Sequence, residues 1–200
     1  MEQHFLGIKG KANSQVARRN LDQVTYHKVL DLVQQGHQVM VFVHARKETV
    51  KSAQAIREAA LADGTLDDFS TQEHPTFSLF RRDIGTSRNK EMKELFNDGF
   101  GIHHAGMLRS DRNMMERMFE ARAIKVGLMP YLFLFPHSHT QVLCCTATLA
   151  WGVNLPAHAG VFYDLVTPFQ DILLCHSSQS SSKAHKFTTA LGVHSWTFLY

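Results

Sequence analysis

Apolar residues along the first part of the chain follow helical spacing in some stretches and form short continuous runs in others. The apolar positions from Val16 to Gln35 recur every three or four residues until Gly36 stops the pattern, which predicts a helix. Residues 63–86 have no clear period and predict a long loop with one turn of helix. The full set of predicted elements comprises strands at 38–43 and 100–103 and helices at 16–35, 48–61, 87–97 and 109–121.

The order of these elements predicts the fold class. Strands that alternate with helices at this spacing favour an α/β fold, with a parallel sheet and helices on both faces. This arrangement matches a partial RecA-like lobe of the P-loop NTPase type, in which ligands bind at the carboxyl ends of the strands. The helix predicted at 109–121 has one face rich in methionine, which indicates that this face packs in the core rather than forming a cofactor site. That face consists of Met114, Met115, Met118 and Phe119.

Three blocks of sequence lie at strand-to-helix junctions, where ligand contacts are expected. They read HQVMVFVHARKET at 37–49, GFGIHHAGMLR at 99–109 and CCTATLAWGVNLPA at 144–157. In the last block, small hydroxyl residues followed by Gly152 and Asn154 leave backbone amides and short polar side chains free to contact a ligand. In this order the blocks resemble motifs IV, IVa and V of the superfamily-two DExH-type helicases, in the branch that includes the spliceosomal and activating-signal-cointegrator helicases.

The resemblance implies a role for particular residues. Contacts to the nucleic-acid backbone fall on Phe42, His44, Arg46, His104, Gly106, Arg109, Thr146 and Thr148. The positions that face the nucleotide are Gly152 and Asn154. Because adjacent strand residues point to opposite faces, at most one of His103 and His104 is expected to face the ligand. Contacts of this kind position a strand without reading its sequence.

In the parent family, ATP and Mg²⁺ are the cofactors, and hydrolysis takes place between two RecA-like lobes. The implied partners are single-stranded nucleic acid, the first RecA-like lobe and cointegrator-complex subunits. These 200 residues contain no G-x-x-x-x-G-K-[ST] loop, no DExH block and no motif VI with its arginine finger. We therefore expect no catalytic residue and no ATP turnover by this chain alone. The expected function is that of the second RecA-like lobe of an ATP-dependent helicase. The alternatives are a non-catalytic nucleic-acid- or protein-binding fragment, or a truncated splice product without a stable fold.

Two departures from the family pattern divide the chain. Deleting residues 127–142 joins Val126 to Leu143 and restores a continuous IKVLCCTATLAWGVNLPA run, which predicts an insertion within a core strand. Prolines at 130 and 136 cannot donate to a central strand. After Ala159 the family pattern ends. The predicted organisation is a linker at 1–15, a partial second RecA-like domain at 16–159 and an irregular, non-family tail at 160–200.

Composition narrows the remaining function classes. A net charge of +3 permits contact with phosphates without requiring it. The 13 histidines are scattered rather than placed at metal-ligand spacing, so no metal site is expected. Three cysteines provide no disulfide framework and favour a reducing compartment, the nucleus, with the cytoplasm as the alternative. No apolar run approaches the roughly 18 residues that span a membrane, so no membrane association is expected.

Overall fold

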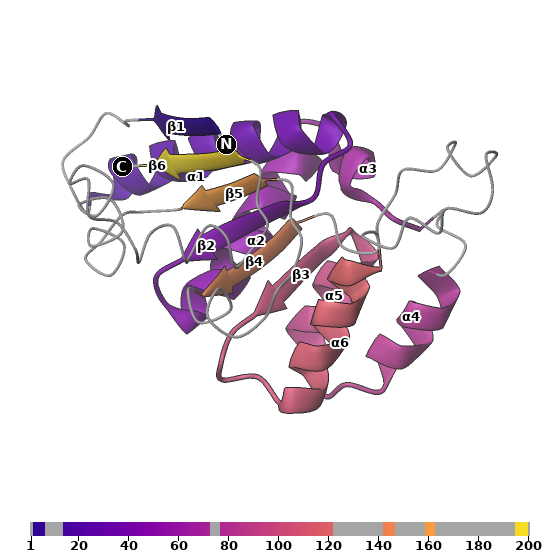
Figure 1. The fold of residues 1–200 in the computed structure, drawn as a ribbon. Coiled ribbons are helices and arrows are strands. Elements are labelled where there is room, and N and C mark those ends of the chain that lie inside the picture. The colour runs from indigo at the N-terminus through magenta and orange to yellow at the C-terminus, as the bar shows by residue number, and fades with distance from the viewer. Residues whose placement is uncertain are drawn as a thin grey trace.

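The computed structural model describes residues 2–6, 14–72, 77–121, 142–146, 159–162 and 195–199. The described strands form one parallel sheet of six strands in the order β1-β6-β5-β2-β4-β3 (Figure 1). The strands are β1 (Glu2–Leu6), β2 (Val39–Val43), β3 (Phe100–His103), β4 (Val142–Thr146), β5 (Ala159–Phe162) and β6 (Ser195–Leu199). The predicted fold class, a partial RecA-like α/β sheet with flanking helices, is confirmed.

The helices that the sequence predicts, α1, α2, α5 and α6, begin and end close to the predicted residues. The first starts after Ser14, whose Oγ accepts a hydrogen bond from the Ala17 N–H at 3.1 Å, and it stops before Gly36, which has a φ of 80°. The six helices are α1 (Gln15–Gln34), α2 (Arg46–Ala62), α3 (Leu66–Phe69), α4 (Phe77–Gly85), α5 (Lys90–Asn97) and α6 (Arg109–Glu120).

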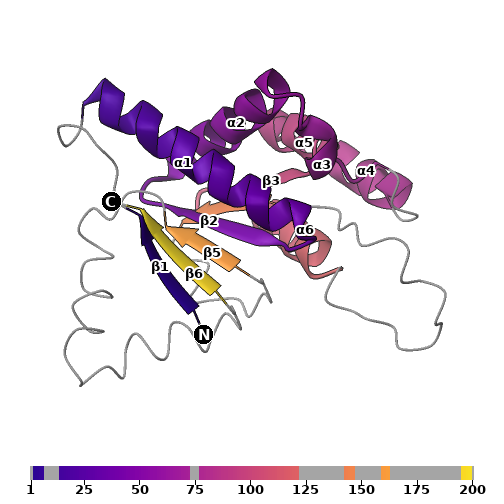
Figure 2. The same cartoon turned by 90° about the horizontal axis from the view of Figure 1, so that it is seen from above.

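Helices cover both faces of the sheet. Figure 2 shows α1, α2 and α5 on one face and α6 on the other. The handedness of parallel connections explains this division. The chain crosses the sheet in one direction from β2 to β3 and returns in the opposite direction from β3 to β4, so right-handed crossovers place α2 and α6 on opposite faces.

The core lies around the neighbouring strands β2 and β4. All five residues of β2 and all five of β4 are buried, as expected for strands that are covered by helices on both faces. From the helices, the predicted methionine face of α6 is confirmed as core, since Met115 and Met118 have no exposed surface. Burial raises the pKa of the Cys144 thiol to about 12, which leaves it protonated and unreactive at neutral pH.

The structure differs from the prediction of a long loop at 63–86. Two helices lie there, α3 and α4, and both are held by aromatic contacts with distant segments. Phe69 stacks on Phe100 with ring centroids 5.1 Å apart, and Phe77 stacks on Phe96 at 5.3 Å. These contacts join residues far apart in the sequence, so a search for local periodicity does not detect them.

The predicted linker and tail also need correction. Strand β1 lies within the predicted linker at 1–15 and pairs with β6, which lies in the tail together with most of β5. These segments are therefore not wholly irregular. Short strands at a sheet edge depend on partners distant in sequence, and their own residues carry little periodic signal. Most of the predicted insertion, including the prolines at 130 and 136, lies outside the described residues.

The end of the predicted insertion lies in a core strand. Val142 is the first residue of β4 and pairs in register with Val39 and Phe100. Since Val126 and Val142 are both valines, deleting residues 126–141 or 127–142 leaves the same polypeptide. The last residue of the predicted insertion therefore belongs to β4, and the deletion product is the same in either description.

Candidate nucleic-acid interface

The three sequence blocks supply three adjacent strands that end at the same edge of the sheet. Strand β4 lies between β2 and β3, so that Thr146 is in register with Val43 and Cys145 with His103. The helices that follow β2 and β3 lie on opposite faces of the sheet, and in α/β sheets ligands bind at the carboxyl ends of strands where the helices diverge in this way. We call the carboxyl ends of β2, β4 and β3 the strand-end edge.

At the end of β2, the structure separates the predicted contact residues. Phe42 is fully buried in the sheet, so its side chain lies in the core rather than at the surface. His44 is exposed directly after the strand, and Arg46 is exposed at the first position of α2. The Glu48 carboxylate accepts a hydrogen bond from the Ala45 N–H at 3.3 Å. This bond fixes the first turn of α2 and so the position of Arg46.

At the end of β3, the two adjacent histidines have different environments. His103 is 3% exposed, and its Nε2 lies 2.7 Å from Oε1 of Glu116. His104 is half-buried, and its Nδ1 accepts a hydrogen bond from the Gly106 N–H at 3.1 Å. Of the pair, only His104 reaches the surface, because His103 ends the buried strand β3 and His104 follows it.

The pKa of each histidine is lowered, with burial as the main cause. For His103 the contact with Glu116 acts in the opposite direction. For His104 the positive charge of Arg46 adds to the lowering. Both rings are therefore neutral at pH 7. With its Nδ1 accepting from Gly106, the neutral ring of His104 carries its proton on Nε2, where it can serve as a hydrogen-bond donor.

The structure brings three of the predicted residues together at this edge. A Cβ added to Gly106 would lie 3.2 Å from Nδ1 of His104 and 3.4 Å from Cδ and Nη1 of Arg46. The loop after β3 therefore packs against the first residue of α2. Arg109 is exposed at the start of α6, next to Leu108, whose side chain is also exposed.

The third block is described only in its strand. Thr146 ends β4 and is 8% exposed. The predicted contact residue Thr148 and the predicted nucleotide-facing residues Gly152 and Asn154 lie outside the described residues.

A pocket of about 460 Å³ adjoins the strand-end edge and involves residues that the sequence analysis missed. One face of α2 forms most of its wall. The side chains of this face recur at helical spacing from Arg46 onward, and this spacing is the feature of the sequence that could have revealed the pocket. We call this pocket the α2 groove. It is lined by Arg46, Lys47, Val50, Lys51, Gln54, Glu91 and His104.

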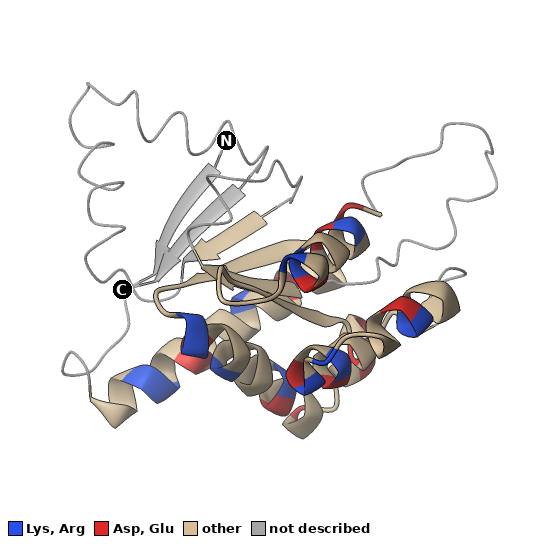
Figure 3. Ribbon diagram, turned by 90° about the horizontal axis from the view of Figure 1, so that it is seen from below, with Lys and Arg blue, Asp and Glu red and all other residues tan. Residues whose placement is uncertain are grey.

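The charge of the α2 groove differs from that of its surroundings. Basic and acidic residues are interleaved along the helices (Figure 3). In the groove, however, three cationic side chains face the single carboxylate of Glu91. In the part of the chain that the structure describes, none of these three cations has a carboxylate within 4.0 Å.

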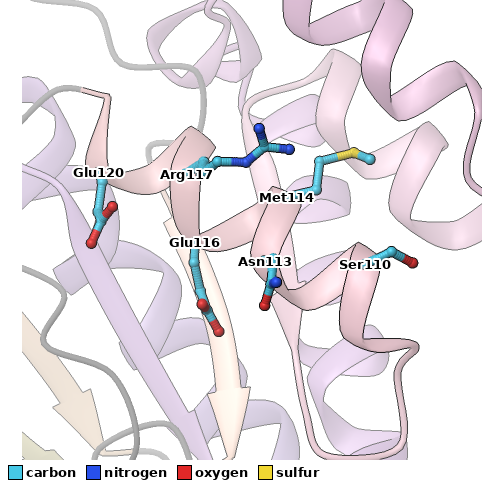
Figure 4. Close-up of a pocket in the computed structure, with 6 residues that line it drawn as sticks. All are labelled: Ser110, Asn113, Met114, Glu116, Arg117 and Glu120. Carbon is cyan, nitrogen blue, oxygen red and sulfur yellow. The ribbon is translucent and has the colours of Figure 1, made fainter.

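A second hollow, of about 550 Å³, lies along α6 (Figure 4). Its lining side chains do not converge on one point, because Glu116 and Glu120 point to one side of the helix and Met114 and Arg117 to the other. One of them, Glu116, is already paired with His103. This hollow therefore offers no convergent binding groups.

The described residues contain neither a metal-binding cluster nor a helix able to cross a membrane. In the ranges that the structure describes, no three His, Cys, Asp or Glu side chains are grouped closely enough to hold a metal ion. No described helix combines the length and apolar character needed to cross a membrane.

Comparison with known proteins identifies the family. No protein-family profile matches the chain. Over 157 residues it is 49% identical to the RQC trigger complex helicase SLH1 of Saccharomyces cerevisiae, a match that covers 78% of this chain and 7% of that protein. The chain is a partial member of the DExH-type helicase family. It is also 48% identical to the activating signal cointegrator 1 complex subunit 3 of Rattus norvegicus over 157 residues, which are 78% of this chain and 6% of that subunit.

A plant relative supports the same family. The chain is 45% identical over 163 residues to the DExH-box ATP-dependent RNA helicase DExH14 of Arabidopsis thaliana, covering 80% of this chain and 7% of that helicase. The chain thus spans less than a tenth of the length of these three helicase-family relatives.

Proposed function

We propose that this chain is part of the second RecA-like lobe of an ATP-dependent helicase and contacts the backbone of single-stranded nucleic acid at the strand-end edge. The observation that carries the proposal is the packing of Arg46 against the loop that holds His104 and Gly106. This packing places the guanidinium, the imidazole and an exposed backbone turn in one small area. Such groups suit phosphates, which proteins bind without reading sequence.

In the whole helicase, further groups complete the site. Thr146 and Thr148 add hydroxyls to the backbone contact, and Arg109 adds a cation from the other side of the edge. Gly152 and Asn154 face ATP and its Mg²⁺ in the cleft formed with the first RecA-like lobe. Cointegrator-complex subunits are the proposed protein partners, and the nucleus is the proposed location. The chain alone does not hydrolyse ATP or unwind a duplex, because the groups that hold the phosphates belong to the other lobe.

Fluorescence anisotropy tests the backbone contact directly. The chain is titrated into labelled oligouridylate and oligothymidylate at low salt, alone and with Arg46→Gln combined with Arg109→Gln. We expect weak binding of both probes, and a loss of about tenfold in the variant, since each cation removed lowers the number of phosphates neutralised. Affinity should also fall steeply with added salt.

The matched control combines Arg117→Gln, on the same helix as Arg109, with Arg81→Gln on α4, which removes the same two charges from exposed positions. Arg117 lies eight residues further along α6, about 12 Å from the strand-end edge. Equal losses in the control and in the variant of Arg46 and Arg109 would point to net charge alone and overturn the assigned site. The absence of binding by the folded wild-type chain would overturn the function itself.

A further inference from the structure

The α2 groove is continuous with the strand-end edge. Arg46 and His104 belong to both, since they meet at Gly106 and also line the groove. From there the groove follows α2 through Lys47, Lys51 and Gln54, all of which are exposed. Lys47 and Lys51 are four residues apart on one helical face, about 6 Å along the axis.

The chemistry of the groove favours phosphate over a protein partner. Its cations have no carboxylate partners among the described residues, and Gln54 offers an amide donor beside them. Of the residues that line it, only Val50 is apolar, and Val50 is half-buried. Protein interfaces depend on buried aromatic and aliphatic anchors, which this groove lacks. Single-stranded nucleic acid binds along positively charged grooves that follow its backbone.

Glu91 opposes an anion in the groove. Its carboxylate lines the groove together with His104 and acts against the burial that lowers the pKa of that histidine. Glu91 is exposed in the first turn of α5. It therefore weakens phosphate binding in the groove.

We propose that the α2 groove binds the next phosphates of the strand held at the strand-end edge, through Lys47, Lys51 and Gln54, with Glu91 limiting its affinity. This inference rests on the proposed function and extends the nucleic-acid path from the strand ends onto the outer face of α2. It predicts that affinity depends on the length of the strand, because only a longer strand reaches both surfaces.

The test compares oligouridylates of four and of ten nucleotides by anisotropy. The wild-type chain should bind the ten-nucleotide probe about tenfold more tightly. Lys47→Gln combined with Lys51→Gln should remove most of this gain and leave the four-nucleotide affinity within about twofold. The salt slope for the longer probe should fall by about 1.4, since each single-strand phosphate contributes about 0.7. Glu91→Gln should tighten binding of the longer probe by about twofold to threefold, by removing a repulsive charge.

The control is Arg81→Gln combined with Arg82→Gln on α4, an exposed pair that lines neither the groove nor the strand-end edge. It removes the same charge and should leave both affinities unchanged. Equal binding of the longer probe by wild type and the lysine variant would overturn the groove while leaving the proposed function intact. Competition by oligoglutamate as strong as that by oligouridylate would overturn recognition of phosphates. Thermal melting of each variant verifies that it remains folded.

Discussion

The Nε2 atom of His103 lies 2.7 Å from Oε1 of Glu116, and this contact joins the end of β3 to the middle of α6. The imidazole is buried, and its Nδ1 has no hydrogen-bond partner among the described residues. A neutral ring with its proton on Nε2 donates to the carboxylate and leaves only an acceptor unsatisfied. Protonation would add a buried N–H at Nδ1, which is more costly.

The first prediction concerns acid stability. The pKa of His103 is lowered by burial, assisted by Arg112 and opposed by Glu116, so it lies below the value of about 6.5 expected in the unfolded chain. Between these two values the unfolded chain binds the extra proton, and stability falls as the pH falls. His103→Gln keeps an N–H donor for Glu116 but does not titrate. We expect its melting temperature to fall less than that of the wild type between pH 7.5 and pH 5.5. If the melting temperatures of the two proteins fall equally over this range, the loss of stability does not come from the protonation of His103.

The second prediction concerns the turn between α5 and β3. Gly99 has a φ of 84°, and a Cβ at this position would lie 1.8 Å from the backbone oxygen of Phe69. Gly99→Ala should therefore lower the free energy of unfolding by about 3 kcal/mol or more, since it adds a backbone clash to left-handed strain. Urea denaturation measures the change.

Two other glycines separate the clash from the strain. Gly64 has a φ of 69° with no atom within 4 Å of the added Cβ, so Gly64→Ala should cost about 1 kcal/mol from strain alone. Gly85 lacks both features, and Gly85→Ala should stay within about 1 kcal/mol of the wild type. If Gly99→Ala and Gly64→Ala lower the free energy of unfolding by similar amounts, the backbone at Phe69 moves away from the added Cβ and the clash makes no contribution.

The third prediction is that deleting residues 127–142 raises the melting temperature. The valine at 126 then takes the place of Val142 opposite Val39, and the connection from α6 to β4 shortens to a length typical of α/β folds. Loop closure alone should contribute about 1 kcal/mol. Differential scanning calorimetry gives the comparison. A lower or equal melting temperature would show that the longer connection stabilises the chain.

The fourth prediction is that the chain shows no nucleic-acid-stimulated ATPase activity. Its 200 residues contain no phosphate-binding loop, no acidic pair and no arginine finger, which together carry phosphoryl transfer in this family. A coupled assay for released phosphate measures turnover with and without oligouridylate. Turnover above the buffer control that is lost in Asn154→Ala would contradict the prediction, because contaminating activity would not respond to that substitution.

Local sequence patterns determined the central elements. The predicted strand at 100–103 coincides with β3, and the predicted helix at 109–121 ends one residue beyond α6. In both, the apolar period and the flanking polar residues act over a few neighbouring positions, so the information is contained in the segment itself. The motif blocks gave the family for the same reason, since each is a continuous run.

The tertiary structure decided which candidate residues face outward. Phe42 and His103 belong to the same blocks as Arg46 and His104, yet both are buried. The alternation of a strand separates two faces of the sheet, but helices cover both faces, so the exposed candidates are those that follow the strand ends. For β2, helices on both faces bury every residue of the strand.

By itself, the sequence determined the α/β class, the family and the position of the blocks at the strand ends. Only the tertiary structure showed that α3 and α4 form, that β1 pairs with β6, and that the strand-end edge continues into the α2 groove. Each of these features depends on contacts between residues distant in the chain, such as Phe69 with Phe100 and Arg46 with Gly106. The periodicity of a segment shows which of its sides is apolar, but it does not show which other segment packs against that side.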